Sequence, residues 1–210
     1  MLALHELFMR RALALAYAQL GRTAPNPAVG CVIVRDGRTL GEAATGNGGR
    51  PHAEELALAL AGEARGADVY LTLEPCGQRS SGGLACATRL GEAGVARVFI
   101  AAADPHPNAA GAGLAVLAQA GVQVELGLLG AEAAKLNEGF FLRVRTGRPL
   151  ALISADPAGF DAALELRPGE DVAAALDRLG AAGLTRVYAA PGAAAAAALA
   201  EWAPESAIRS

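Results

Sequence analysis

Four residues with metal-binding or acid–base side chains constrain the fold of this chain more than any other feature. His52 and Glu54 stand two positions apart in Pro-His-Ala-Glu, Cys76 ends the run Leu-Glu-Pro-Cys, and Cys86 follows ten positions later. One imidazole and two thiolates can hold a zinc ion in three tetrahedral positions and leave the fourth for water. Zinc lowers the pKa of such a water to about 7, and a neighbouring carboxylate can move its protons. The chain must therefore fold so that these side chains meet.

Each of these residues also has an ordinary structural explanation. Taken singly, His52 can be a surface residue before a helix, and either cysteine can be a small core residue. The joint pattern His-x-Glu…Pro-Cys…Cys is the signature of zinc-dependent base deaminases, and its four members together are improbable by chance. We therefore expect His52, Cys76 and Cys86 as zinc ligands and Glu54 as the catalytic acid and base.

The third cysteine and the first histidine are expected to have no part in the chemistry. Cys31 lies inside the apolar run 29–34, where buried packing is the better explanation. His5 lies on an amphipathic helix and is expected to be solvated. Three cysteines do not make a disulfide framework, so a reducing cytoplasm is expected.

The composition excludes several other functions. The 210 residues are 53% apolar with a net charge of −3, which supplies a core but no basic footprint for nucleic acid. No segment reaches the roughly 20 uninterrupted apolar residues that a membrane span needs. Residues 1–20 resemble a signal sequence only superficially, because two arginines interrupt them. We therefore expect a small-molecule substrate and neither a nucleic acid nor a membrane as partner.

Hydrophobic periodicity predicts alternating strands and helices up to about residue 146. Helices are expected at 2–20, 52–63, 86–93, 109–120 and 131–145, and strands at 29–34, 39–44, 69–73, 96–102 and 122–126. An initial hairpin followed by such alternation implies an α/β fold, with one sheet between two helical layers. His52 and Cys86 then lie in the first turns of helices, and Cys76 lies just past a strand, so the three can converge at one sheet edge.

Residues 147–210 differ in composition from residues 1–146, because they are rich in alanine and glycine. Short strands are expected at 150–154, 161–165 and 186–189, with a helix at 170–180. Residues 193–200 are nearly all alanine and can be helical, but are expected to bury little. A segment of this size is near the lower limit for independent folding, so we expect it to pack on the first domain or to be partly disordered.

Several runs of residues resemble one known family. The specific runs are Thr23-Ala-Pro-Asn-Pro, Leu136-Asn-Glu-Gly-Phe and Arg145-Thr-Gly-Arg-Pro, beside Pro51-His-Ala-Glu and Leu71-Thr-Leu-Glu-Pro-Cys. Over roughly residues 6–149 the chain resembles the deaminase domain of the bifunctional riboflavin-biosynthesis deaminase/reductase. The wide separation of the two cysteines also follows that family.

The resemblance implies a three-layer α/β/α cytidine-deaminase-like domain with a five-stranded mixed sheet. It also implies hydrolysis of 2,5-diamino-6-ribosylamino-4(3H)-pyrimidinone 5′-phosphate to 5-amino-6-ribosylamino-2,4-pyrimidinedione 5′-phosphate and ammonia, with Zn2+ as cofactor. By that match Asn26 would bind the pyrimidine and Asp104 the ribose-phosphate end. Gln78, Arg79 and His106 are the other expected substrate contacts. A homo-oligomer, and a reductase on a separate polypeptide, are the implied partners.

Two departures from the family concern substrate recognition. Thr45 stands where the family usually has a histidine seven positions before the zinc histidine. The loop 77–85 is one residue longer, with Gln78 in the place of another histidine. Arg79 on that loop can meet a phosphate or simply be solvated. A zinc deaminase acting on another aminopyrimidine or purine is therefore the alternative.

The third departure is the C-terminal part, which resembles a truncated reductase domain. Residues 148–154 begin as that domain does, and 171–199 resemble its late segment, with the middle missing. Ala190-Pro191-Gly192 replaces a Glu-Gly-Gly turn, and a proline removes a backbone donor from a phosphate cradle. We therefore expect no reductase activity and no nicotinamide cofactor. A non-catalytic homologue that binds a partner reductase is the hypothesis from a different class.

Overall fold

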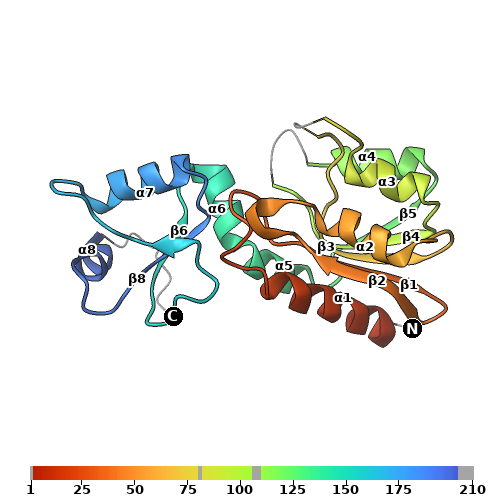
Figure 1. The fold of residues 1–210 in the computed structure, drawn as a ribbon, viewed down its shortest axis with the longest axis horizontal. Helices are drawn as coiled ribbons and strands as arrows, with labels where there is room; N and C mark the ends of the chain where they lie inside the picture. Colours follow the sequence, from red (N-terminus) through yellow and green to blue (C-terminus); the bar gives the residue numbers. More distant parts are fainter. Residues whose placement is uncertain (1, 80–81, 106–109, 203–210) are drawn as a thin grey trace.

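Two separate β-sheets organise the chain (Figure 1). The computed structural model describes residues 2–79, 82–105 and 110–202. The larger sheet has the strand order β2-β1-β3-β4-β5. Its strands are β1 (Gly30–Arg35), β2 (Arg38–Ala44), β3 (Asp68–Leu73), β4 (Arg97–Ala102) and β5 (Gln123–Leu126). β1 runs antiparallel to β2 and β3, whereas β3, β4 and β5 are parallel, so the predicted mixed five-stranded sheet is confirmed.

The β1–β2 hairpin forms where the sequence places Asp36-Gly37. Both turn residues have positive φ, 52° at Asp36 and 74° at Gly37. Such a two-residue turn matches the right-handed twist of the flanking strands, and glycine adopts it without a steric penalty. The turn therefore fixes the register in which Arg35 pairs with Arg38.

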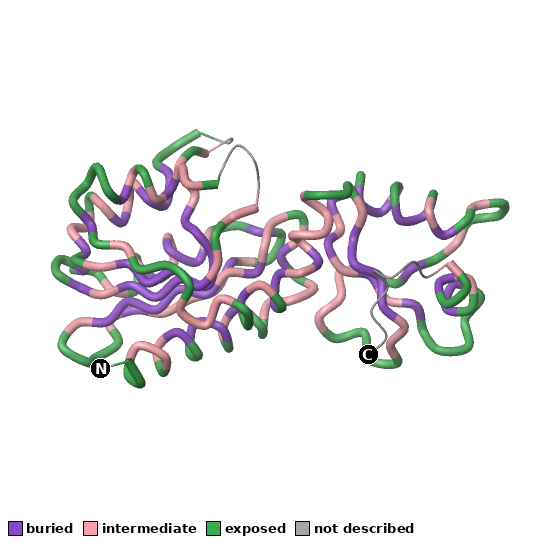
Figure 2. The backbone as a smooth tube through the Cα atoms, turned by 180° about the vertical axis from the view of Figure 1, so that it is seen from behind, coloured by how far each residue is buried: buried purple, intermediate pink, exposed green. Residues whose placement is uncertain are grey.

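Helices cover both faces of the larger sheet. Successive side chains of β1 point to opposite faces of the sheet. Cys31 and Ile33 belong to the hydrophobic cluster on one face, and Val32 and Val34 to the cluster on the other. The first cluster lies under α2 (Ala53–Ala61), α3 (Cys86–Glu92) and α4 (Ala112–Gln119), and the second under α1 (Leu2–Tyr17) and α5 (Gly130–Leu136). Figure 2 shows burial concentrated in the central strands. The three-layer arrangement and the burial of Cys31 are confirmed.

The single helix predicted at 131–145 is wrong, because the chain forms two helices there. α5 ends at Leu136, and α6 (Glu138–Thr146) follows after Asn137, whose φ of −96° and ψ of 17° lie outside the helical range. The buried Asn137 side chain donates from Nδ2 to the carbonyl of Ala28 at 3.0 Å. This bond to a distant loop fixes the break.

The expectation that His5 is solvated is also wrong. Its Nδ1 lies 2.8 Å from the Tyr70 hydroxyl, and its ring stacks on Phe99 with the centroids 4.4 Å apart. The His5 side chain is therefore half-buried, and it packs against β3 and β4.

Residues 148–202 build a second, smaller unit with a core of its own. Its parallel sheet has the order β6-β8-β7, and α7 and α8 pack beside it. The elements are β6 (Leu150–Ile153), β7 (Ala162–Ala163), α7 (Val172–Ala181), β8 (Arg186–Ala189) and α8 (Ala194–Trp202). The expectation that the alanine run buries little is wrong, since Ala195 and Ala196 are each 5% exposed and Leu199 2%. Small side chains let this helix lie close to its neighbours.

The two units meet at α6, which lies between them in Figure 1. α6 contacts β6, and Arg143 of α6 donates from Nε to the carbonyl of Gly180 at 3.0 Å. Among the described residues, no helix has both the length and the apolar character needed to cross a membrane.

Candidate zinc site

Three different segments bring the predicted ligands to one edge of the larger sheet. His52 occupies the cap position before α2, and Cys86 is the first residue of α3. Cys76 lies in the loop that follows β3. The carboxyl ends of parallel strands are where open α/β sheets place their sites, so the topology explains why these residues meet.

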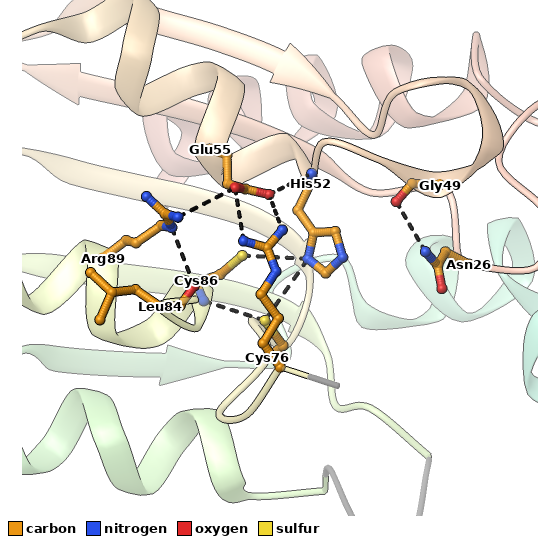
Figure 3. A network of polar contacts seen from close by, with 9 residues as sticks. Asn26, Gly49, His52, Glu55, Cys76, Leu84, Cys86 and Arg89 are labelled. Carbon is orange, nitrogen blue, oxygen red and sulfur yellow. Dashed lines mark hydrogen bonds and ion pairs between the residues drawn. The ribbon is translucent and has the colours of Figure 1, made fainter. Parts of the chain in front are cut away.

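The geometry of the three side chains fits a zinc ion. His52 Nδ1 lies 3.8 Å from Cys76 Sγ and 3.4 Å from Cys86 Sγ, and the three ligand atoms lie within 4.8 Å of one another (Figure 3). Tetrahedral zinc, with bonds of about 2.0–2.3 Å, separates its nitrogen and sulfur ligands by about 3.6 Å. One imidazole and two thiolates are a common donor set for a catalytic zinc. These three residues would hold the ion.

The charges of the two sulfurs support the same conclusion. Hydrogen bonding with Cys86, and next with His52, lowers the pKa of the Cys76 thiol to about 4. The backbone N–H of Cys86 also donates to Cys76 Sγ at 3.3 Å. The pKa of the Cys86 thiol is raised, chiefly by its hydrogen bond with Cys76. Two adjacent thiolates repel each other, so a divalent cation is the natural means of ionising both.

Glu54 lies next to this cluster and is almost fully enclosed. Its exposure is 3%, and burial raises the pKa of its carboxyl. It lines, with His52 and Cys76, a partly open cavity of about 160 Å³ to which other residues also contribute. Those residues are Asn26, Pro27, Val29, Thr45, Gly49, Leu73, Glu74, Asp104 and Phe140. A buried carboxyl beside a metal site in a cleft is suited to moving protons near neutral pH.

Two of the expected substrate residues line this cavity. Asn26 donates from Nδ2 to the carbonyl of Gly49 at 3.0 Å, which fixes its amide beside the opening (Figure 3). Asp104 also lines the cavity, and its backbone N–H donates to Glu74 Oε2 at 3.4 Å. Thr45 also lines the cavity, but its hydroxyl lies 3.0 Å from the Val29 amide, from which it accepts.

The other expected substrate residues are not brought to the cavity. Gln78 is exposed and lies outside the lining. The alternative that Arg79 is solvated is wrong, because its side chain is only 10% exposed and forms a two-pronged ion pair with Glu55. His106 lies outside the described residues.

Glu55 is the residue that sequence reasoning missed. One of its oxygens accepts from the backbone N–H of His52 at 3.0 Å, and its carboxylate also pairs with Arg79 and Arg89. The Arg79 guanidinium lowers the pKa of the Glu55 carboxyl to about 2. A single carboxylate thus connects the segments that carry His52, Cys76 and Cys86. Glu55 stands three residues after the helix cap, where a capping box places a glutamate, and this spacing was the available signal.

Comparisons with known proteins agree with this geometry. Residues 2–102 match the family described as the cytidine and deoxycytidylate deaminase zinc-binding region. The riboflavin biosynthesis protein RibD of Escherichia coli is 50% identical over 145 residues, which cover 69% of this chain and 39% of that protein. This chain thus spans about two fifths of the length of such RibD relatives.

A shorter relative matches almost from end to end. The diaminohydroxyphosphoribosylamino-pyrimidine deaminase of Buchnera aphidicola subsp. Schizaphis graminum is 41% identical over 143 residues, which cover 68% of this chain and 97% of that protein.

Solved structures extend the comparison to the fold. Acinetobacter baumannii RibD superposes with a TM-score of 0.68 at 41% identity, over 77% of this chain and 44% of that one. A Thermotoga maritima deaminase/reductase structure shares the fold over 96% of this chain and 85% of its own, with a TM-score of 0.84 at 22% identity. The chain belongs to the zinc-dependent diaminohydroxyphosphoribosylaminopyrimidine deaminase family.

Proposed function

We propose that this protein removes the 2-amino group of 2,5-diamino-6-ribosylamino-4(3H)-pyrimidinone 5′-phosphate by hydrolysis. Water supplies the oxygen of the 5-amino-6-ribosylamino-2,4-pyrimidinedione 5′-phosphate product, and the amine leaves as ammonia. The observation that carries the proposal is that Glu54, His52 and Cys76 line one cavity, with Cys86 close enough to His52 and Cys76 to complete a metal site. The shorter Buchnera relative, 97% of which is covered by the match, is named for this reaction.

Zinc, when bound, supplies a Lewis acid that makes a water molecule acidic enough to act as a nucleophile near neutral pH. The protein's own contribution is proton transfer at the Glu54 carboxylate. Glu54 takes one proton from the attacking water and delivers it to the ring nitrogen; it then takes the second proton, from the hydroxyl now on the ring carbon, and delivers it to the departing amine. Because burial raises its pKa, this carboxyl holds a proton more readily than an exposed one during the exchange.

The shape of the cavity suits a single heterocyclic ring. Its volume of about 160 Å³ is below the roughly 300–1,000 Å³ of sites that enclose a drug-sized ligand. Val29, Leu73 and Phe140 provide apolar walls that limit water around the base. Asn26 would then orient the pyrimidine, and Asp104 would meet the ribose, with the phosphate outside the enclosed volume.

A direct assay tests the proposal. Purified protein with its zinc content measured is incubated with the diaminopyrimidinone phosphate, and ammonia is quantified. Stoichiometric release of ammonia with conversion to the pyrimidinedione is expected. Protein that carries zinc and releases no ammonia from this compound would exclude the assigned substrate.

A second candidate keeps the mechanism but changes the base. Thr45 and Gln78 replace two histidines that the family uses near the substrate, and Gln78 lies away from the cavity. Another aminopyrimidine, or a purine, is therefore the alternative substrate. A panel of such bases and nucleotides in the same ammonia assay separates the two, since the larger kcat/KM identifies the substrate.

The remaining assignments belong to the same proposal. Residues 1–146 would be the deaminase domain and 147–210 a remnant of a reductase domain, with the reductase activity on a separate polypeptide. The fold likeness to the Thermotoga structure across both units supports this division. The protein would self-associate and work in the cytoplasm, where its three free cysteines stay reduced. Light scattering of the purified protein measures the oligomeric state.

A further inference from the structure

Described residues of the smaller unit contact two segments of the larger one that line the cavity. One is the loop 20–27, which carries Asn26 and Pro27, and the other is α6, which carries Phe140. Each contact is close enough to fix the backbone position of the segment that it meets. None of the cavity-lining residues comes from the described part of the smaller unit, so its effect on the site acts through these two segments.

At the loop, a glycine of each unit packs directly against the other unit. A Cβ added at Gly21, whose φ is +75°, would lie 2.5 Å from the carbonyl oxygen of Phe160. A Cβ added at Gly183, whose φ is +92°, would lie 2.9 Å from Pro25 Cβ. No residue larger than glycine fits either place without a shift of the backbone. The loop is therefore held on both sides within five residues of Asn26.

At α6, the contact is equally close. A Cβ added at Gly139 would lie 2.5 Å from the Thr185 carbonyl oxygen, and Arg186 pairs with Glu138 at 3.4 Å. The Arg186 guanidinium also lies 5.6 Å from the centroid of the Phe160 ring. Arg186 thus joins the contact at α6 to the contact at the loop.

The position of the loop is passed on to Gly49, which also lines the cavity. The Asn26 amide bonds to the Gly49 carbonyl, and the Gly48 N–H donates to the Arg22 carbonyl at 2.8 Å. A Cβ at Gly49 would lie 2.4 Å from Asn26 Nδ2, so the two segments touch directly. A displacement of residues 21–25 would therefore move Asn26 and Gly49 together.

We propose that residues 147–202 serve as a positioning unit for the deaminase cavity, setting the place of Asn26 through the loop 20–27 and of Phe140 through α6. This gives the smaller unit a role that needs no reductase chemistry. The catalytic part of the inference rests on the proposed function, whereas the positioning part can be measured without substrate.

The test compares two alanine variants of the full-length, zinc-loaded chain. Gly183→Ala strains a positive φ and also presses on Pro25. Gly192→Ala strains a similar φ of +84° in the same unit, but its Cβ would meet nothing within 4 Å. The matched pair separates the contact from a general loss of stability in the smaller unit.

Amide hydrogen exchange of residues 21–27 is the first readout, and steady-state kinetics with the diaminopyrimidinone phosphate is the second. In Gly183→Ala we expect faster exchange in that loop and a fall in kcat/KM of roughly ten- to a hundredfold, carried by KM, since a misplacement of about 1 Å has effects of this size. Zinc content and kcat should stay near those of the parent, and Gly192→Ala should match the parent in both readouts.

Several outcomes would overturn the proposal. Unchanged loop exchange or unchanged KM in Gly183→Ala would do so, and so would equal effects in Gly192→Ala. Should Gly183→Ala not fold, Arg186→Met removes the pairing with Glu138 without adding bulk, and the same criteria apply to it. If the parent protein does not turn over this substrate, the proposed function fails, and the exchange comparison alone decides the positioning role.

Discussion

Glu54 is the residue at which proton transfer can be tested without changing a metal ligand. It lies beside the three donors but is not one of them, and its carboxyl is buried with a raised pKa. A Glu54→Gln change keeps the shape of the side chain and removes its ability to exchange protons. We expect kcat to fall by roughly 10²- to 10⁴-fold, the usual contribution of a positioned acid or base. Metal analysis should still find the zinc bound. Turnover close to that of the parent would disprove the assigned role.

The ionisation of Glu55 leads to a prediction about how the stability of the folded state depends on pH. Its folded pKa of about 2 lies below the ordinary 4.5, because the Arg79 guanidinium favours the charged form. A lowered carboxyl pKa stabilises the folded state fully above pH 4.5, and this stabilisation is lost as pH falls through about 2. Glu55→Gln should therefore lose less stability than the parent between pH 5 and pH 2.

The difference should reach about 1–2 kcal/mol once solvent screening is allowed for. Urea unfolding of both proteins after zinc removal measures it without a contribution from the metal ligands. Parallel stability curves for the two proteins over this pH range would contradict the prediction.

The residues of the site differ in how readily the sequence reveals them. His52, Glu54, Cys76 and Cys86 stand in short local motifs, so their spacing alone nominates them. The pairing of Glu55 with Arg79 spans 24 residues and depends on how the loop after β3 folds back, which no local pattern specifies. Arg79 was expected to face a phosphate or solvent for the same reason.

At the scale of elements, α4 approaches the loop that carries Cys76 closely at Gly113. A Cβ at Gly113 would lie 1.9 Å from the carbonyl oxygen of Pro75, and the Gly113 N–H donates to Glu74 Oε1 at 3.2 Å. Gly113→Ala must therefore push α4 and the loop apart. Overpacking of this kind costs about 1–3 kcal/mol. We expect that loss together with faster zinc release to a chelator, because Cys76 directly follows Pro75.

Gly91→Ala is the control for this prediction. Gly91 is also helical, and its added Cβ would meet Ala120 Cβ at 2.8 Å, between α3 and α4 but away from Cys76. Denaturant unfolding should show a loss of stability here too, while chelator competition shows zinc release like that of the parent. Equal zinc release in the two variants would mean that Gly113 does not act through the ligand loop.

Element type was easier to predict than element boundaries. The apolar, β-branched run of β1 and the Asp36-Gly37 turn are local, so the hairpin follows from the sequence. The break at Asn137 depends on the Ala28 carbonyl, 109 residues away, and no helical periodicity reveals it. The burial of α8 was underestimated because each alanine side chain has little apolar volume. Burial of this helix depends instead on how closely a helix of small residues can approach a sheet.

At the scale of the whole molecule, the smaller unit raises the question of a nicotinamide cofactor. In α/β folds a nucleotide phosphate is commonly held by backbone N–H groups where a strand leads into a helix. Here β8 leads into α8 through Ala190-Pro191-Gly192, and Pro191 has no N–H to offer. We expect no binding of NADPH to the full-length protein, measured by calorimetric titration, and no reduction of the deaminated ribosylamino product. The Thermotoga maritima protein, whose name includes both activities, is the positive control. Saturable NADPH binding by this chain would show that the smaller unit keeps a cofactor site in addition to its contacts with the loop 20–27 and α6.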